Sequence, residues 1–316
     1  MNKNKRFRME GFFSKYGILV GLLLLIIFFS LKAPRFLSVT NAISLLRQIS
    51  ILSLLSTGLT FCMILNEFDL SIGEMCGLSG VLVTSLLLAG YSQIAAVLLV
   101  LFIGVIFGLL NGLIVTKVRI SSFIVTLAMS TIILGFNYFI TRGKPIYGQF
   151  PAGFIALGRG DLLSIPVPVI IALVFLTLGI IFTKKTKYGR YMYAIGGNII
   201  AARYSGIATD RYRILGLVLS QFCAAMGGIV LASRLGSGQP TAGSGYLMNC
   251  FATVFLGTAI FGERIPNLLG TFVGVVIMGV LNNGLTMIAV PYYYEYIIQG
   301  AVLIGAVALT RIQAKS

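Results

Sequence analysis

Long apolar runs dominate the chain, and this feature constrains its fold more than any other. A helix that crosses a bilayer needs about 20 mainly apolar residues, and ten runs in the sequence approach or exceed that length. They lie at about residues 17–31, 43–65, 69–90, 93–116, 122–141, 162–183, 214–233, 246–262, 267–290 and 294–310. The predicted fold class is therefore an all-α integral membrane protein, a polytopic bundle of about 10 transmembrane helices.

The composition supports this class and excludes most catalytic chemistry. Charged residues make up 10% of the 316 residues, whereas a soluble domain carries about 25%. The chain contains no histidine, which removes the imidazole general base and the histidine metal ligand. It also lacks a Gly-x-x-x-x-Gly-Lys-[Ser/Thr] phosphate-binding loop. We expect no enzyme activity, no catalytic residue and no metal site in this chain.

The formal charge of +16 reads as a topology signal, not as a nucleic-acid surface, because the basic residues lie between the apolar runs. When both termini are placed in the cytoplasm, the 24 basic residues divide 17 inside to 7 outside. This is the asymmetry that the positive-inside rule requires. We therefore expect one transmembrane domain over 1–316, with a cytoplasmic N-terminal tail at about 1–16.

Glycine is abundant inside the apolar runs, at the spacing that lets two helices approach closely. The clearest stripes are Gly73/Gly77, Gly104/Gly108/Gly112 and Gly270/Gly274. Residues 104–112 also resemble residues 274–284, in an alignment that pairs Asn111 with Asn282. Two explanations remain open. One is an internal repeat of two halves, which is common in transporters, and the other is a chance match.

Polar side chains gather between the second and third runs. The segment Asn66-Glu67-Phe68-Asp69-Leu-Ser71 is followed closely by Gly73 and Glu74. Three carboxylates so close to membrane depth suggest function by default. The residues alone leave two interpretations: a solvated turn between two spans, or a broken helix whose freed groups line a polar pathway.

The longest polar interruption, about residues 184–213, is cytoplasmic in this topology. Within it Asn198 is suited to begin a helix, Ala201 and Ala202 favour helix, and Gly206 is suited to end it. The pattern predicts a short amphipathic helix outside the membrane. Such a helix either lies on anionic lipid or docks a soluble partner, and composition does not separate the two.

Five segments, in order along the chain, carry a family resemblance. They are residues 36–41, 68–73, 194–207, 233–246 and 270–284. Together they resemble the permease subunits of bacterial ABC importers of the ribose and monosaccharide type, in the branched-chain amino acid/ribose permease superfamily. The resemblance runs from about residue 35 to 305.

The resemblance implies a permease of the bacterial cytoplasmic (inner) membrane that translocates a pentose- or hexose-like solute. It implies an extracytoplasmic solute-binding protein, ABC ATPase subunits that hold ATP and Mg²⁺, a second permease chain, and no cofactor on this chain. A homodimer is favoured over a heterodimer. An ion- or proton-coupled secondary transporter is the alternative function. Nucleosides, autoinducer-like furanoses and polyols are alternative solutes, because residues 66–68 depart from the family's usual Gly-Gly-Ile.

The resemblance also assigns candidate site residues. Coupling to the ATPase is expected at Gly196, Gly197, Asn198, Ala201, Ala202, Ser205, Gly206 and Ile207. The translocation pathway is expected at Asn66, Asp69, Ser71, Asn111, Asn282 and Asn283. The Asp69-Leu-Ser71-Ile-Gly73 segment resembles an internal family motif, which favours the broken helix over the turn.

Overall fold

A computed structural model describes residues 20–260 and 265–313. The predicted N-terminal tail at about residues 1–16 lies outside this range. The elements are a helix at Val20–Lys32, α2 (Val39–Ile64), α3 (Ile72–Leu88), α4 (Gln93–Leu113), the π-helix η1 (Ile114–Val118), α5 (Ser122–Thr141), β1 (Ile146–Tyr147), α6 (Ala152–Arg159), β2 (Asp161–Leu162), β3 (Ile165–Pro166), α7 (Val167–Lys185), α8 (Lys187–Gly197), α9 (Ile199–Tyr204), α10 (Thr209–Leu235), β4 (Ser237–Gly238), α11 (Tyr246–Ile260), α12 (Leu268–Met287) and α13 (Tyr292–Gln313).

Each of the ten predicted apolar runs overlaps one helix of this order. Within the described residues, six helical segments are long and apolar enough to cross a membrane: α2, α4 with η1, α5, α7, α10 and α12. The helix at Val20–Lys32, α3 and α11 are shorter apolar helices. The predicted class, a polytopic helical membrane protein, is confirmed.

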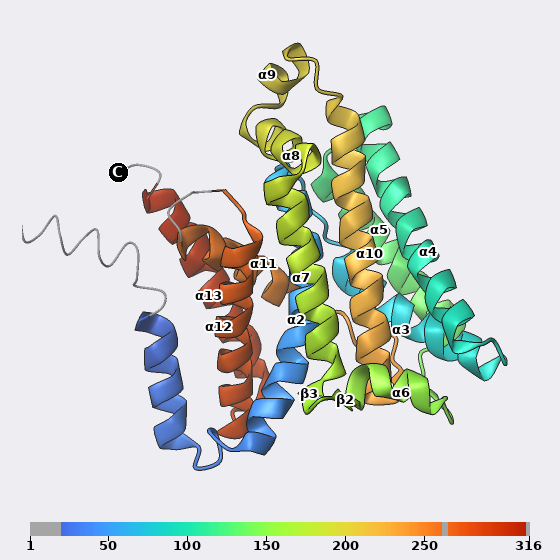
Figure 1. Cartoon of the computed structure of the whole chain (residues 1–316), viewed down its shortest axis with the longest axis vertical. Helices are drawn as coiled ribbons and strands as arrows, with labels where there is room; N and C mark the ends of the chain where they lie inside the picture. The colour runs from blue at the N-terminus through green and yellow to red at the C-terminus, as the bar shows by residue number, and fades with distance from the viewer. Residues whose placement is uncertain (1–19, 261–264, 314–316) are drawn as a thin grey trace, which may run out of the picture. The chain divides into compact units, whose positions relative to one another are not determined.

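The chain forms two compact units. The central unit comprises Ser50–Leu247, and the terminal unit comprises the described residues up to Ile49 together with those from Met248. Helix α2 contributes to both. In the central unit α10 packs along α3 and α4, and Figure 1 shows α8 and α9 at one end of its long helices, with α6, β2 and β3 at the other end.

The glycine stripe of α4 faces α10, as the spacing predicted. A Cβ atom on Gly108 would lie 2.6 Å from Cα of Val218, and one on Gly112 would lie 2.8 Å from Cα of Ile214. Backbones this close exclude any side chain at the crossing, so dispersion contacts between the two backbones hold the helices together.

The segment at 233–246 is ordered and folds onto α3. Its strand β4 pairs antiparallel with β1. A Cβ atom on Gly73 would lie 2.9 Å from the carbonyl oxygen of Gly243, and one on Gly77 would lie 2.9 Å from that of Pro240. The Gly73/Gly77 stripe therefore packs against a loop, whereas its spacing predicted packing against another helix.

The Gly270/Gly274 stripe lies on α12, in the terminal unit. A Cβ atom on Gly270 would overlap the carbonyl oxygen of Gly257, and one on Gly274 would overlap that of Thr253, so α12 lies directly against α11. A side chain on Gly284 would overlap the ring of Phe29. Small residues on α12 thus set its approach to two neighbours.

Some elements were not predicted. Helix α6 and the antiparallel β2–β3 pair occupy a stretch in which the sequence shows only the start of an apolar run at about 162–183. Helix α7 begins later than that run, at Val167. Pro166 belongs to the strand pair, and Pro168 lies in the first turn of the helix, where a missing N–H is tolerated.

Candidate functional site

Helix α9 is delimited by its own sequence. The Asn198 side-chain oxygen accepts hydrogen bonds from the backbone N–H groups of Ile200 and Ala201, both at 3.0 Å. At the other end Gly206 has φ +80°. Its N–H bonds the Arg203 carbonyl at 3.0 Å, and the next N–H bonds the Ala202 carbonyl at 3.1 Å. These two bonds form a Schellman motif, so the predicted start and stop of this helix are confirmed.

One face of α9 is exposed and apolar. Ile200 is 65% exposed and Tyr204 is 90% exposed, and their i, i+4 spacing puts them on the same side of the helix. Ala202 is only 5% exposed and faces the protein. Of the other predicted coupling residues, Gly197, Asn198, Ala201, Ser205 and Gly206 are exposed, and Gly196 and Ile207 are half-buried.

The end of α8 is tied to the segment that follows α2. A Cβ atom on Gly196 would overlap the carbonyl oxygen of Ile64, whereas nothing lies within 4 Å of a Cβ on Gly197. The Asn66 amide donates to the Gly196 carbonyl at 2.5 Å, and Asn66 itself has φ 58°. Gly196 is therefore a contact between backbones, and Gly197 faces open space.

The segment between α2 and α3 is not helical, and α5 satisfies part of its backbone. The N–H of Phe68 donates to the Ser122 hydroxyl, and the N–H of Leu70 donates to the Thr126 hydroxyl, both at 3.0 Å. Non-helical backbone at membrane depth requires such internal partners. Because α3 begins only at Ile72 and has 17 residues, the structure favours the broken helix over the simple turn.

The break carries a buried polar cluster, defined here as Asp69, Ser71, Asn111 and Gln221. All four residues are fully buried. Oδ1 of Asp69 accepts from the Ser71 hydroxyl at 2.6 Å, and Oδ2 accepts from the Gln221 amide at 2.6 Å. The Gln221 and Asn111 amides also donate to the Ser71 hydroxyl, at 2.9 and 3.2 Å. This network holds α3, α4 and α10 together at the break.

Glu67 has a separate partner. Its carboxylate accepts a hydrogen bond from the guanidinium of Arg213 at the start of α10. Glu67 is buried, and the Arg213 side chain is 18% exposed. Three anchors, at Asn66, Glu67 and Asp69, therefore connect the break to the end of α8 and to α10.

A second set of amides lies in the terminal unit. Asn41 and Asn283 exchange reciprocal amide bonds of 3.0 and 2.9 Å. Asn282 donates to Asn249 at 3.1 Å and accepts from Gln299 at 3.3 Å. The structure thus brings Asp69, Ser71 and Asn111 together in the central unit, places Asn66 at the end of α8, and joins Asn282 and Asn283 to other amides.

Sequence reasoning missed several of these residues: Gln221, Asn41, Asn249, Gln299, Ile200 and Tyr204. A polar amide inside an apolar run was the available signal for Gln221 and Asn249. For Ile200 and Tyr204 the signal was the apolar i, i+4 pair on a very short helix. In the part of the chain that the structure describes, no three His, Cys, Asp or Glu side chains are grouped to hold a metal ion.

The helical bundle and its apolar spans define a polytopic membrane protein. The family model for the permease component of branched-chain amino acid transport systems matches residues 41–307. The chain belongs to this family of ABC transporter permeases, which are not themselves catalytic and for which no cofactor is expected. An ABC importer permease works with an ATPase and a binding protein, so the secondary-transporter alternative is set aside.

Curated relatives match over nearly their whole length. The ribose import permease protein RbsC of Bacillus subtilis is 39% identical, over 98% of this chain and 96% of the relative. The D-allose transport system permease protein AlsC of Escherichia coli is 32% identical, over 99% and 97%. The galactose/methyl galactoside import permease protein MglC of Escherichia coli is 33% identical, over 93% of each. No solved structure matches the chain.

Proposed function

We propose that the chain is the permease of an ATP-driven importer for a pentose- or hexose-like sugar that an extracytoplasmic binding protein delivers. The named substrates of three relatives (ribose, D-allose and galactose or methyl galactoside) support a monosaccharide. Nucleosides, autoinducer-like furanoses and polyols are the competing solutes. Competition of unlabelled compounds against labelled ribose uptake in proteoliposomes separates these classes.

The proposed topology has ten spans over one permease domain, 1–316, with both termini in the cytoplasm of a bacterial cell. The ten apolar runs and their ten helices support the count. The end of the central unit that carries η1, α8 and α9 holds nine basic residues: Lys117, Arg119, Lys184, Lys185, Lys187, Arg190, Arg203, Arg211 and Arg213. Four, Arg142, Lys144, Arg159 and Arg234, lie toward the other end, which favours the α9 end as cytoplasmic.

The observation that carries the coupling proposal is the exposed face of α9. A short helix capped at both ends, with Ile200 and Tyr204 exposed, is suited to enter a groove of a soluble protein. We assign the partner as the ABC ATPase. The segment 196–207 would move as a rigid body when the ATPase closes on ATP.

The anchors at the break give that motion a route. Asn66 is bonded to the end of α8, and Glu67 and Asp69 are bonded to α10. A displacement of α8 and α9 would therefore change the conformation of residues 65–71. The backbone of Gly196 packs directly on that of Ile64, and the Asn66 side chain is hydrogen-bonded to the Gly196 carbonyl.

The six pathway candidates remain part of the proposal. Asp69, Ser71 and Asn111 are fully buried, so contact with a solute requires a conformation in which the cluster opens. Asn282 and Asn283 carry amides of the kind that bind sugar hydroxyls, and their likeness to the region of Asn111 supports an internal repeat. Substitution of Asn282 by alanine should lower sugar uptake without lowering assembly with the ATPase.

Two copies of the chain are proposed to frame the pathway, as a homodimer, with a heterodimer of two permease chains as the alternative. The mass of the importer that assembles from this chain, its ATPase and its binding protein alone would distinguish the two. Transport activity of that minimal set supports the homodimer.

The coupling proposal is tested with Gly197→Leu and Ala201→Leu. Both positions are exposed, and Gly197 faces open space, so each variant should insert and fold normally. Gly135→Leu on α5, another exposed glycine with nothing within 4 Å, is the matched control. We expect loss of binding-protein-stimulated ATP hydrolysis and of uptake in the two α9 variants only. Normal coupled uptake in both would refute the assignment.

A further inference from the structure

A pocket of about 580 Å³ opens in the central unit where η1 meets the junction of α9 and α10. We call it the basic pocket. Its walls carry Lys117 and Arg119 on one side and Arg203, Arg211 and Arg213 on the other. One acidic residue, Asp210, also lines it. The transport proposal assigns no role to this pocket.

Two of the five cations are neutralised. Arg213 pairs with Glu67, and Arg203 pairs with Asp210 at 3.4 Å while also donating to the Thr209 hydroxyl at 3.2 Å. Among the described residues, no ion pair neutralises Lys117, Arg119 or Arg211. The pocket therefore has an excess of three positive charges.

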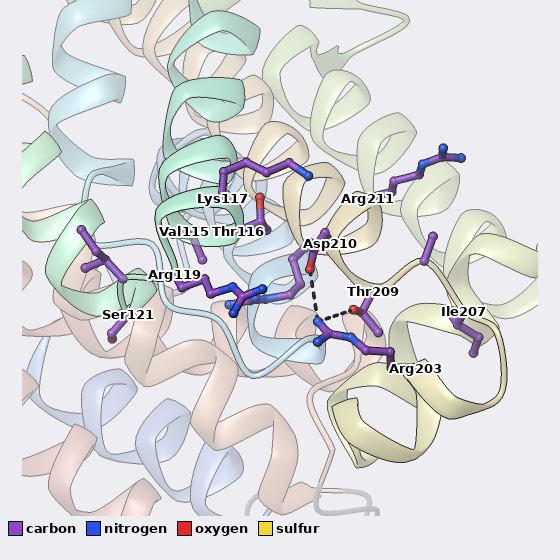
Figure 2. A pocket seen from close by; sticks show the side chains of 13 residues that line it. Val115, Thr116, Lys117, Arg119, Ser121, Arg203, Ile207, Thr209, Asp210 and Arg211 are labelled. Carbon is purple, nitrogen blue, oxygen red and sulfur yellow. Dashed lines mark hydrogen bonds and ion pairs between the residues drawn. The ribbon is translucent and has the colours of Figure 1, made fainter.

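The side chains are arranged around a shared space. Figure 2 shows the guanidinium groups of Arg119 and Arg203 extending toward the same space from opposite sides, while Arg211 extends away from it. Like charges in this arrangement repel each other unless an anion lies between them. Arg119 has φ 64° and ends η1.

Apolar surface adjoins these cations. Val118 is 63% exposed, Phe123 is 50% exposed and Ile124 is 59% exposed, and they lie on η1 and the first turn of α5. Helices α4 with η1 and α5 are apolar candidate spans with mostly exposed windows, which in a membrane face lipid or another membrane segment. A charged pocket at the end of such helices lies at the depth of lipid headgroups.

We propose that the basic pocket binds the phosphate group of an acidic phospholipid, with Lys117 and Arg119 as its charged ligands and the acyl chains along α4 and α5. Guanidinium and ammonium groups are the usual partners of phosphate oxygens. A carboxylate on a soluble protein would satisfy the charge but would make no use of the adjoining apolar surface. The sugar pathway candidates do not line this pocket, whereas Arg203 and Ile207 of the proposed coupling segment do, so the test below also follows ATPase association.

The test compares Lys117→Gln/Arg119→Gln with the original chain. Both side chains are exposed and form no ion pair in the described structure, so the variant should fold, and its unfolding midpoint checks this. The matched control is Lys184→Gln/Lys185→Gln, an exposed basic pair at the end of α7 that changes the net charge equally. Binding of phosphatidylglycerol and of phosphatidylcholine with the same chains is measured by native mass spectrometry and by thermal stabilisation in detergent.

We expect phosphatidylglycerol to bind the original chain and the control, and to bind the double variant about thirtyfold more weakly. Equal loss in the control, or equal binding of phosphatidylcholine, would overturn the proposal. Inorganic phosphate at the same concentration is the third arm: stabilisation equal to that by the lipid would assign a free anion instead. Unchanged lipid binding with loss of ATPase association would assign the pocket to the partner protein.

Discussion

Replacing Gln221 on α10 with methionine should destabilise the central unit. The Gln221 amide donates to Oδ2 of Asp69 at 2.6 Å and to the Ser71 hydroxyl at 2.9 Å. Methionine has a similar length and flexibility but offers no donor. The change therefore removes two hydrogen bonds without opening a large cavity.

The magnitude depends on the charge of Asp69. A bond to a charged group contributes about 1.5–3 kcal/mol and a neutral one about 1 kcal/mol, whereas neutral bonds between transmembrane helices average about 0.6 kcal/mol. With Asp69 ionised, the loss is about 3 kcal/mol, and with Asp69 protonated it is about 1 kcal/mol. We expect the larger value, because both oxygens of Asp69 accept hydrogen bonds, from the Ser71 hydroxyl and N–H and from the Gln221 amide, and such donors favour the ionised carboxylate.

Equilibrium unfolding in mixed detergent micelles measures this difference. The matched control is Ser233→Ala, which removes one buried neutral bond from α10 to the Phe154 carbonyl at 2.6 Å and should lower stability by about 1 kcal/mol. A double-mutant cycle with Asp69→Asn isolates the pair. A loss below about 1 kcal/mol for Gln221→Met, or the same loss with Asp69 and with Asn at 69, would refute the reasoning.

Further substitutions probe the end of α8, the anchor at Glu67 and the paired amides of the terminal unit. Gly196→Ala should lower the unfolding free energy by about 1–3 kcal/mol, because its Cβ atom would overlap a carbonyl of α2, while Gly197→Ala should change it by less than about 0.5 kcal/mol; thermal unfolding compares the two. Glu67→Gln should lower the unfolding free energy by about 2 kcal/mol, because the partly buried Arg213 guanidinium loses its counter-charge. Equilibrium unfolding in mixed detergent micelles measures this loss. Asn283→Leu should cost about 1 kcal/mol through loss of two amide bonds, and an equal loss for Asn283→Asp would contradict the paired-amide account.

Sequence reasoning was most reliable where the cause is local. The start of α9 at Asn198 and its stop at Gly206 follow from side-chain capping and from a positive φ, both of which need only neighbouring residues. The positions of the apolar runs follow from membrane thickness. The stripe around Gly108 could be assigned to helix packing because a spacing of four puts small residues on one face.

The partners of these features could not be predicted in the same way. Gln221 reaches Ser71 across 150 positions of sequence, and every apolar run offers similar surface to its neighbours. The loop that contains Gly243, and not another helix, packs against the glycine face of α3. Hydropathy alone does not predict which segment covers such a face. Helix α6 has eight residues, too few to appear as a membrane span, so it was not predicted ahead of the run at about 162–183.

The acidic residues of the break show how the structure changes an interpretation that the sequence left open. In the sequence, Glu67, Asp69 and Glu74 could serve as proton sites of a coupled transporter. In the structure each has a hydrogen-bond partner on another element: Arg213 for Glu67, Gln221 for Asp69, and the Ser244 hydroxyl for Glu74 at 2.9 Å.

Groups bonded in this way fix the backbone of a non-helical segment, which must satisfy its polar atoms internally. Carboxylates at membrane depth are costly. Here Glu67 and Asp69 lie in the non-helical segment before α3, the same segment to which the end of α8 is hydrogen-bonded. The placement of Glu67 and Asp69 therefore favours a structural role, in which they hold the break in one conformation; under the coupling proposal, a displacement of α8 and α9 would change that conformation. A proton-coupled carrier would instead need a carboxylate in the break that solvent can reach, and Glu67 and Asp69 are both buried.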